Sequence, residues 1–225
     1  MTQDDRNWRR HFVYRAELTK TTWKLRIGVV VIILLVLRLT SGWWTAAIAR
    51  SLICDANAVR SDAILIETFD FQYDLFERAA DLRHGGLAAR VLIPLPIDSA
   101  TREPKSITVA VVELMAERSR LGTFEIVPVR EVEPITLNAT RDVQRFFDRE
   151  HIRSVIVVTS LLRSRRSSLV YADTLGRAGI DVRYQPGRSA VNVNDWTRSW
   201  HGIQDVLQQW LKLQYYRLYV LPVYS

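Results

Sequence analysis

Residues 154–159 read Ser-Val-Ile-Val-Val-Thr, and the polar residues 160–166, Ser-Leu-Leu-Arg-Ser-Arg-Arg, follow them at once. A short uncharged run rich in β-branched residues is typical of a strand that is buried on both faces of its sheet. Strands of that kind occur mainly in parallel sheets covered by helices. This stretch therefore predicts an α/β domain.

The sequence on both sides of this strand alternates between short apolar runs and helical patterns. The expected strands are 63–67, 90–95, 124–129, 154–159 and 180–185, and the expected helices are 71–82, 107–121, 138–150, 162–178 and 200–211. The alternation predicts a Rossmann-like three-layer α/β sandwich with a mostly parallel five-stranded sheet and right-handed crossovers. The stretch VAVVELMA within 107–121 predicts that this helix is heavily buried.

An uncharged apolar run from Ile27 to Leu37 predicts one transmembrane helix over residues 25–49. Residues 27–49 form about 35 Å of helix, and a hydrocarbon core is about 30 Å thick. Arg38 costs about 3 kcal/mol at mid-bilayer, or less if the span begins nearer Thr21. Two alternatives are a cleaved signal peptide ending at Ala47-Ile48-Ala49 and a core helix of the domain.

The net charge of +7 is concentrated ahead of the apolar run, since residues 1–26 hold seven basic and three acidic side chains. Such a bias favours a cytoplasmic N-terminus and an α/β domain outside the cytoplasmic (inner) membrane. We expect a single-pass protein with a basic tail over 1–24, an anchor over 25–49, a linker over 50–60 and the α/β domain over 61–225. The same distribution argues against a nucleic-acid partner.

The standard signatures of metal, cofactor and nucleophile sites are absent from the sequence. The single cysteine, Cys54, excludes an internal disulfide and any site built from several cysteines. The four histidines lack metal-ligand spacing, and no GxSxG, Walker or GxGxxG pattern occurs. We therefore predict neither a metal nor a cofactor.

Candidate ligand-binding residues follow the expected strands, because ligands of open α/β sheets bind beyond the carboxyl ends of the strands. Thr159 and Ser160 end the clearest strand, and Arg163 and Arg166 begin the next helix. Helix amides, hydroxyls and guanidinium groups together predict a site for an anion or phosphate. The alternative is a simple helix cap with solvated arginines.

Four further residues complete the candidate set. Glu67 and Glu133 follow the first and third strands, and a shared pocket would let these carboxylates act as an acid–base pair. Asn138 either orients a ligand or caps the third helix. Arg78, within the first helix, is either a ligand contact or a surface ion-pair partner.

The C-terminal segment is rich in aromatic residues, which we expect to pack in the core and over the sheet. The alternative is contact with the outer membrane–water interface. These residues are Trp196, Trp200, Trp210, Tyr215, Tyr216, Tyr219 and Tyr224.

Four stretches, in order, resemble the SanA/ElyC/YdcF family, an envelope-associated domain family of unknown function. They are residues 61–66, Arg78–Leu82 with Gly85-Gly86, Glu133–Asn138, and Val157–Arg166. The resemblance covers about residues 61–217. It implies a role in envelope biogenesis, in the supply of peptidoglycan, its lipid carrier or surface polysaccharide.

The chain also departs from the family pattern. The turn Glu67-Thr68-Phe69-Asp70 lacks the family's glycines, Ala139 and Arg141 replace polar and acidic residues, and Arg163 replaces a histidine. Arginine cannot act as an acid–base at neutral pH, but it can bind an anion. The first hypothesis is therefore a divergent member that binds an anionic, phosphate-bearing metabolite or lipid phosphate. The alternatives are a non-catalytic module that binds envelope or exopolysaccharide assembly proteins, and a carboxylate-dependent transferase or hydrolase.

Overall fold

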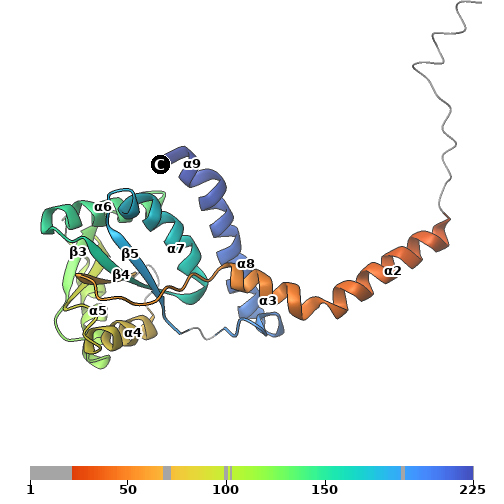
Figure 1. Ribbon diagram of the computed structural model, residues 1–225, viewed down its shortest axis with the longest axis horizontal. Coiled ribbons are helices and arrows are strands. Elements are labelled where there is room, and N and C mark those ends of the chain that lie inside the picture. Colours follow the sequence, from red (N-terminus) through yellow and green to blue (C-terminus); the bar gives the residue numbers. More distant parts are fainter. Residues whose placement is uncertain (1–21, 68–71, 99–100, 102, 189–190, 225) are drawn as a thin grey trace, which may run out of the picture. The chain divides into compact units, whose positions relative to one another are not determined.

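The computed structural model describes residues 22–67, 72–98, 101, 103–188 and 191–224 (Figure 1). The expected basic tail, up to residue 21, and residues 68–71 of the glycine-free turn lie outside the described residues. The chain forms two units, Met1–Ser41 and Gly42–Ser225.

The first unit contains one described helix, α2 (Trp23–Leu39), none of whose residues is buried. Thr40 separates it from α3 (Ser41–Ser51), so residues 25–49 do not form the single continuous helix that the sequence predicts. Within the described residues, no one helix is both long enough and apolar enough to cross a membrane, although α2 and α3 together meet both conditions.

The second unit is built on a sheet whose five strands are all parallel, in the order β3-β2-β1-β4-β5. The strands are β1 (Ala63–Ile66), β2 (Arg90–Pro96), β3 (Glu125–Val129), β4 (Ser154–Thr159) and β5 (Asp181–Pro186). The prediction of a parallel five-stranded α/β sheet is confirmed, and β4 has the predicted bounds. β1 is buried along its whole length, and β4 is buried from Val155 onward.

Helices pack on both faces of this sheet (Figure 1). They are α4 (Tyr73–His84) and α5 (Ser106–Arg118) on one face, and α6 (Ile135–Glu150) and α7 (Ser164–Tyr171) on the other. Phe76 of α4 packs in the same core as Ile64, whereas Phe147 of α6 packs with Leu65. Neighbouring strand residues thus serve opposite faces, as the pleat of a strand requires.

Helix α5 is less buried than its VAVVELMA stretch predicts. Val112 and Ala116 are its buried residues, and Leu114 is 52% exposed. The helix connects β2 to β3, and β3 is an edge strand of the sheet. A narrow apolar stripe is enough to cover that edge, which explains the difference.

A smaller core joins α3 to the C-terminal helix α8 (Trp200–Tyr215) within the second unit. Its buried members are Ala49, Leu52, Leu162, Trp196, Val206 and Leu213. The indole nitrogen of Trp196 donates to the Thr45 carbonyl at 2.9 Å. Residues 50–60, which we expected to be a linker, therefore begin inside a packed core.

The segment after α3 is also hydrogen-bonded to the start of α7. The backbone amide of Arg165 donates to the Leu52 carbonyl at 3.0 Å, and the Cys54 amide donates to the Ser164 hydroxyl at 2.8 Å. The lone cysteine thus lies in a segment that is fixed to the domain.

The C-terminal aromatic residues divide into two groups. The expectation that they pack in the core is confirmed for Trp196 and Tyr216, which are 5% and 7% exposed, and is wrong for the others. Trp200 is 72% exposed, and Trp210, Tyr215, Tyr219 and Tyr224 are 38–51% exposed. The last two tyrosines lie in the turn η5 (Tyr216–Val220) and in α9 (Leu221–Tyr224), which continue α8.

Candidate functional site

The chain changes direction across the sheet between β1 and β4. It adds β2 and β3 on one side of β1, and then β4 and β5 on the other side. In open α/β sheets, ligands bind beyond the carboxyl ends of the strands at such a switch point. Glu67 directly follows β1, and Thr159 is the last residue of β4, so both lie at this position.

Four side chains form a buried polar group here, which we call the switch-point cluster: Glu67, Thr159, Arg163 and Ser167. The Glu67 side chain has no exposed surface. Its Oε2 accepts hydrogen bonds from the Ser167 hydroxyl at 2.6 Å and from the Thr159 hydroxyl. Arg163 Nε lies 3.9 Å from the same oxygen, which is too far for a hydrogen bond. At this distance the positively charged guanidinium group attracts the Glu67 carboxylate through its charge.

The other carboxylate oxygen, Glu67 Oε1, is buried and has no hydrogen-bond partner among the described residues. An acceptor left in this state costs on the order of 1–3 kcal/mol. Proteins retain such atoms where an ordered water, an ion or a ligand completes the bonding. Glu67 Oε1 therefore has the capacity to accept one more hydrogen bond, from an ordered water or from a ligand that reaches the cluster.

Tyr171 lies one helical turn beyond Ser167 on α7 and is fully buried. Burial raises the pKa of Tyr171 well above its ordinary value, and the negative charge of Glu67 raises it further, against an opposing effect of Arg163. The phenol therefore stays protonated at neutral pH. Tyr171 can take part in hydrogen bonding but cannot act as a base.

Both arginines of the predicted anion site are buried, Arg163 at 7% and Arg166 at 5% exposure. The expected helix over 162–178 is divided into η2 (Leu161–Arg163), α7 and η3 (Ala172–Gly176). Arg163 ends the first of these pieces. Arg166 lies in α7, where its guanidinium stands 5.5 Å from the centre of the Tyr216 ring.

The structure thus brings Glu67, Thr159 and Arg163 together and places Arg166 against the C-terminal segment. Ser160 is partly exposed, and its carbonyl accepts a hydrogen bond from the Arg163 amide at 3.0 Å. The contact of Ser160 with Arg163 is therefore made by the backbone.

Glu133 and Asn138 have local roles at the start of α6. Asn138 Nδ2 donates to the carbonyls of Val132 and Glu133, at 3.1 Å each. Glu133 Oε2 accepts from the Ile135 amide at 3.4 Å. The helix begins at Ile135, earlier than the predicted Asn138, because Asn138 holds the preceding turn instead of capping the helix. The amide that we expected to orient a ligand is thus used within the protein.

Arg78 contacts a buried amide. Its Nη2 donates to Gln185 Oε1, and Gln185 Nε2 donates to the Ala56 carbonyl. Gln185 is 4% exposed and lies on β5. Arg78 therefore connects α4 to β5 and, through Gln185, to the segment that follows α3.

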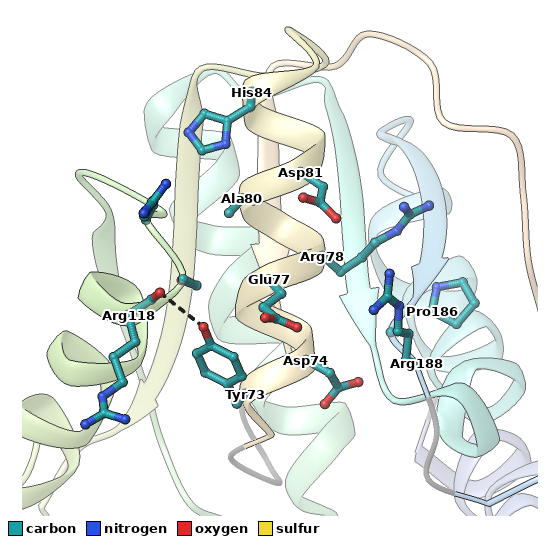
Figure 2. A pocket seen from close by; sticks show the side chains of 13 residues that line it. Tyr73, Asp74, Glu77, Arg78, Ala80, Asp81, His84, Arg118, Pro186 and Arg188 are labelled. Carbon is teal, nitrogen blue, oxygen red and sulfur yellow. Dashed lines mark hydrogen bonds between the residues drawn. The ribbon is translucent and has the colours of Figure 1, made fainter.

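Arg78 also lines a cavity of about 500 Å³ that extends over α4 (Figure 2). Figure 2 shows Asp74 and Arg78 on one side of the helix, and Tyr73 and Arg118 on the other. Burial raises the pKa of Asp74, whose Oδ2 has no hydrogen-bond partner in the described part of the chain. A Cβ at Gly187 would lie 2.5 Å from that oxygen and 2.7 Å from Leu75 Cδ2, so a larger residue at this position would displace these side chains.

A second cavity, of about 520 Å³, lies beyond the carboxyl ends of β2 and β3 and is lined by Lys105 and Arg130, among others. Neither cavity has Glu67 or Glu133 among its described lining residues. The described residues also contain no group of three or more His, Cys, Asp or Glu side chains that could hold a metal ion.

Sequence reasoning missed Ser167 and Tyr171. The available signal was their spacing, since positions 163, 167 and 171 are four residues apart and lie on one side of a helix. A polar residue that faces the core at that spacing indicates a buried partner. Here the partner is Glu67, which is 100 residues away from Ser167 in sequence.

No protein-family model matches this sequence, and no curated protein or solved structure gives a significant match. The resemblance of four short stretches to the SanA/ElyC/YdcF family therefore stays a prediction.

Proposed function

We propose that this chain is a membrane-anchored envelope protein whose Rossmann-like domain binds a small anionic ligand at the switch-point cluster. The observation that carries the proposal is the buried, unpartnered oxygen Glu67 Oε1. A ligand hydroxyl that donates to this oxygen completes its bonding. The positive charge of Arg163, 3.9 Å from the opposite carboxylate oxygen, favours an anionic group on the same ligand.

The anchor is helix α2. From Ile27 to Leu39, the one polar side chain is that of Arg38, and none of these residues is buried in the protein. Its 17 residues form about 26 Å of helix, which is shorter than a hydrocarbon core of about 30 Å, so residues that flank α2 or local thinning of the bilayer would complete the span. Lys24 and Arg26 in its first turn support a cytoplasmic N-terminus and an extracytoplasmic domain.

The envelope role follows from the family resemblance and from this orientation. Sugar phosphates, nucleotide sugars and polyprenyl phosphates all carry a phosphate, and the first two also carry hydroxyl groups. Compounds with both groups fit a site that combines a carboxylate acceptor with a nearby guanidinium group.

A non-catalytic interaction module is the second candidate, because many polar groups near the site already bond within the protein. Thr159 and Ser167 donate to Glu67, and Asn138 donates to backbone carbonyls. Arg166 contacts the Tyr216 ring. A module of this kind binds envelope assembly proteins and has no small ligand at the switch point.

Thermal unfolding of the full-length chain in detergent micelles separates the two candidates. The probes are phosphorylated sugars, nucleotide sugars and short polyprenyl phosphates. A ligand at 100 times its dissociation constant adds about 2.7 kcal/mol of stability. We expect the resulting rise in melting temperature in the wild type and its loss in Glu67→Gln.

Glu133→Gln is the matched control, since Glu133 is an exposed carboxylate whose side chain accepts a hydrogen bond from the nearby Ile135 amide. It should respond to ligand as the wild type does. A panel without any response, or an equal response in Glu67→Gln, would contradict ligand binding at the cluster and favour the interaction module.

A further inference from the structure

Helix α8 has a second apolar face, opposite the one that packs on the domain. Gly202, Val206 and Leu213 are its buried residues. Trp200, Leu207 and Leu211 are 72%, 47% and 61% exposed, and Leu218, in the turn that continues the helix, is 72% exposed. Spacings of seven and four residues place these exposed side chains along one line of the helix.

Aromatic side chains border this line, which we call the outer α8 face. Trp210 is 38% exposed and Tyr215 is 51% exposed, and the ring of Tyr215 stacks on that of Tyr219 at 5.5 Å between centroids. Tryptophan and tyrosine are enriched at membrane–water interfaces, where an apolar ring and a polar tip both find suitable surroundings. A helix that lies in such an interface combines an apolar face with basic residues, and Lys212 and Arg217 lie on this segment.

The same compact unit carries a second exposed aromatic pair on α3, where Trp43 is 79% exposed and Trp44 is 38% exposed. Ala49 of α3 packs in one core with Val206 of α8, so the two helices are fixed to each other. Only Thr40 and Ser41 lie between the end of α2 and Gly42. Thr40 alone separates the last residue of α2 from Ser41, the first residue of α3, so the two helices follow each other directly along the chain.

We propose that the outer α8 face and the α3 tryptophans lie in the headgroup region of the bilayer that holds α2. This inference rests on the proposed anchor. When α2 is inserted, the chain connection delivers α3 to the membrane surface, and the shared core carries α8 with it. The α/β domain then contacts the membrane along α8.

Spin labels on the full-length chain in phosphatidylcholine–phosphatidylglycerol vesicles test this arrangement. In a Cys54→Ser background, one label is attached at a time to Leu211→Cys, to Val31→Cys on α2, and to Glu117→Cys on α5. Glu117 is exposed on the helix layer of the opposite sheet face from α7. Collision rates with oxygen, which enters lipid, and with a water-soluble nickel chelate report the surroundings of each label.

We expect nickel collisions at Leu211 to be several-fold fewer than at Glu117, and oxygen collisions to be more frequent. Equal rates at Leu211 and Glu117, with Val31 protected from nickel, would overturn the docking surface and leave the anchor intact. A Val31 label as accessible to nickel as the Glu117 label would overturn the anchor. Protection of Leu211 from both agents, with spin–spin broadening, would show that a second copy covers this face and would overturn the lipid contact.

Discussion

Two carboxylates in this domain each face an arginine, yet their surroundings differ. Asp142 on α6 accepts hydrogen bonds at both oxygens: Oδ1 from Arg130 Nη2 at 2.8 Å, and Oδ2 from the Arg130 amide at 2.9 Å. Arg145 adds a contact with Oδ1 at 2.9 Å. Glu67 has one oxygen that accepts from two hydroxyls and lies 3.9 Å from Arg163, and one buried oxygen that accepts no hydrogen bond from a described residue.

The comparison separates a structural carboxylate from a candidate binding carboxylate. The arginines that bond Asp142 are 51% and 64% exposed, so water screens the interaction and the contact mainly fixes α6 to the end of β3. Glu67 and Arg163 are both enclosed, and enclosed charges are costly unless their hydrogen bonding is complete. Glu67 is the enclosed carboxylate whose hydrogen bonding is incomplete, so it is the one whose bonding a ligand can complete.

The largest expected effect is that of Arg163→Met, which leaves the buried Glu67 carboxylate without its nearby cation. We expect a loss of about 3 kcal/mol in the free energy of unfolding. Arg130→Met should cost clearly less, because Arg145 still contacts Asp142 and the site is hydrated. Thermal unfolding of the full-length variants in detergent, followed by circular dichroism, measures both losses. Equal losses would remove the distinction between the two carboxylates.

A smaller effect is expected from Thr159→Val, which removes a hydroxyl that donates to Glu67 while nearly keeping the side-chain volume. An incompletely bonded buried carboxylate should cost about 2 kcal/mol. Thr174→Val is the control, since this buried hydroxyl donates to the helix carbonyl of Val170 and not to a charge. The same unfolding measurement should give the control less than half the loss of Thr159→Val.

The smallest effect is a dependence on pH. Burial raises the pKa of Asp142, but the hydrogen bonds and charge of Arg130, with the charge of Arg145, lower it more, so the pKa is lower than normal. Asp142 therefore stabilises the fold fully above its unfolded-state pKa of about 3.9, and this contribution is lost as the pH falls through the folded-state pKa.

We expect the wild type to melt above Asp142→Asn near pH 6, where the carboxylate is ionised in both states, and the two melting temperatures to converge well below pH 4. A difference that stays constant from about pH 6 to pH 3 would show that the ionised pair with Arg130 does not stabilise the domain.

The sheet could be predicted from the sequence because its signals are local. The run Val155–Val158 is apolar and β-branched, and the structure buries it completely. The cluster at its carboxyl end could not be predicted in detail, because the hydroxyl of Thr159 and its acceptor Glu67 are 92 residues apart in sequence. The expected order of strands and helices along the chain placed Glu67 and Thr159 at the carboxyl ends of their strands, as the structure does. Only the packed structure shows which polar groups pair there.

For helix α8, the sequence predicts the element itself but not which of its faces packs on the domain. Its apolar residues predicted an amphipathic helix, and the helix exists. The sequence contains two apolar stripes, one through Val206 and Leu213 and another through Leu207 and Leu211, and hydropathy alone does not say which one faces the core. The structure assigns the first stripe to the core, because Val206 and Leu213 pack with Leu52 and Trp196.

The hydrogen bond from Trp196 to the Thr45 carbonyl has a consequence for the biosynthesis of this protein. A leader peptidase acting after Ala49 would remove both the acceptor of that buried indole and a core residue that has no exposed surface. The lost acceptor alone would cost about 1–3 kcal/mol. Proteolytic release at this position would thus weaken the released domain, because its packing uses residues of α3.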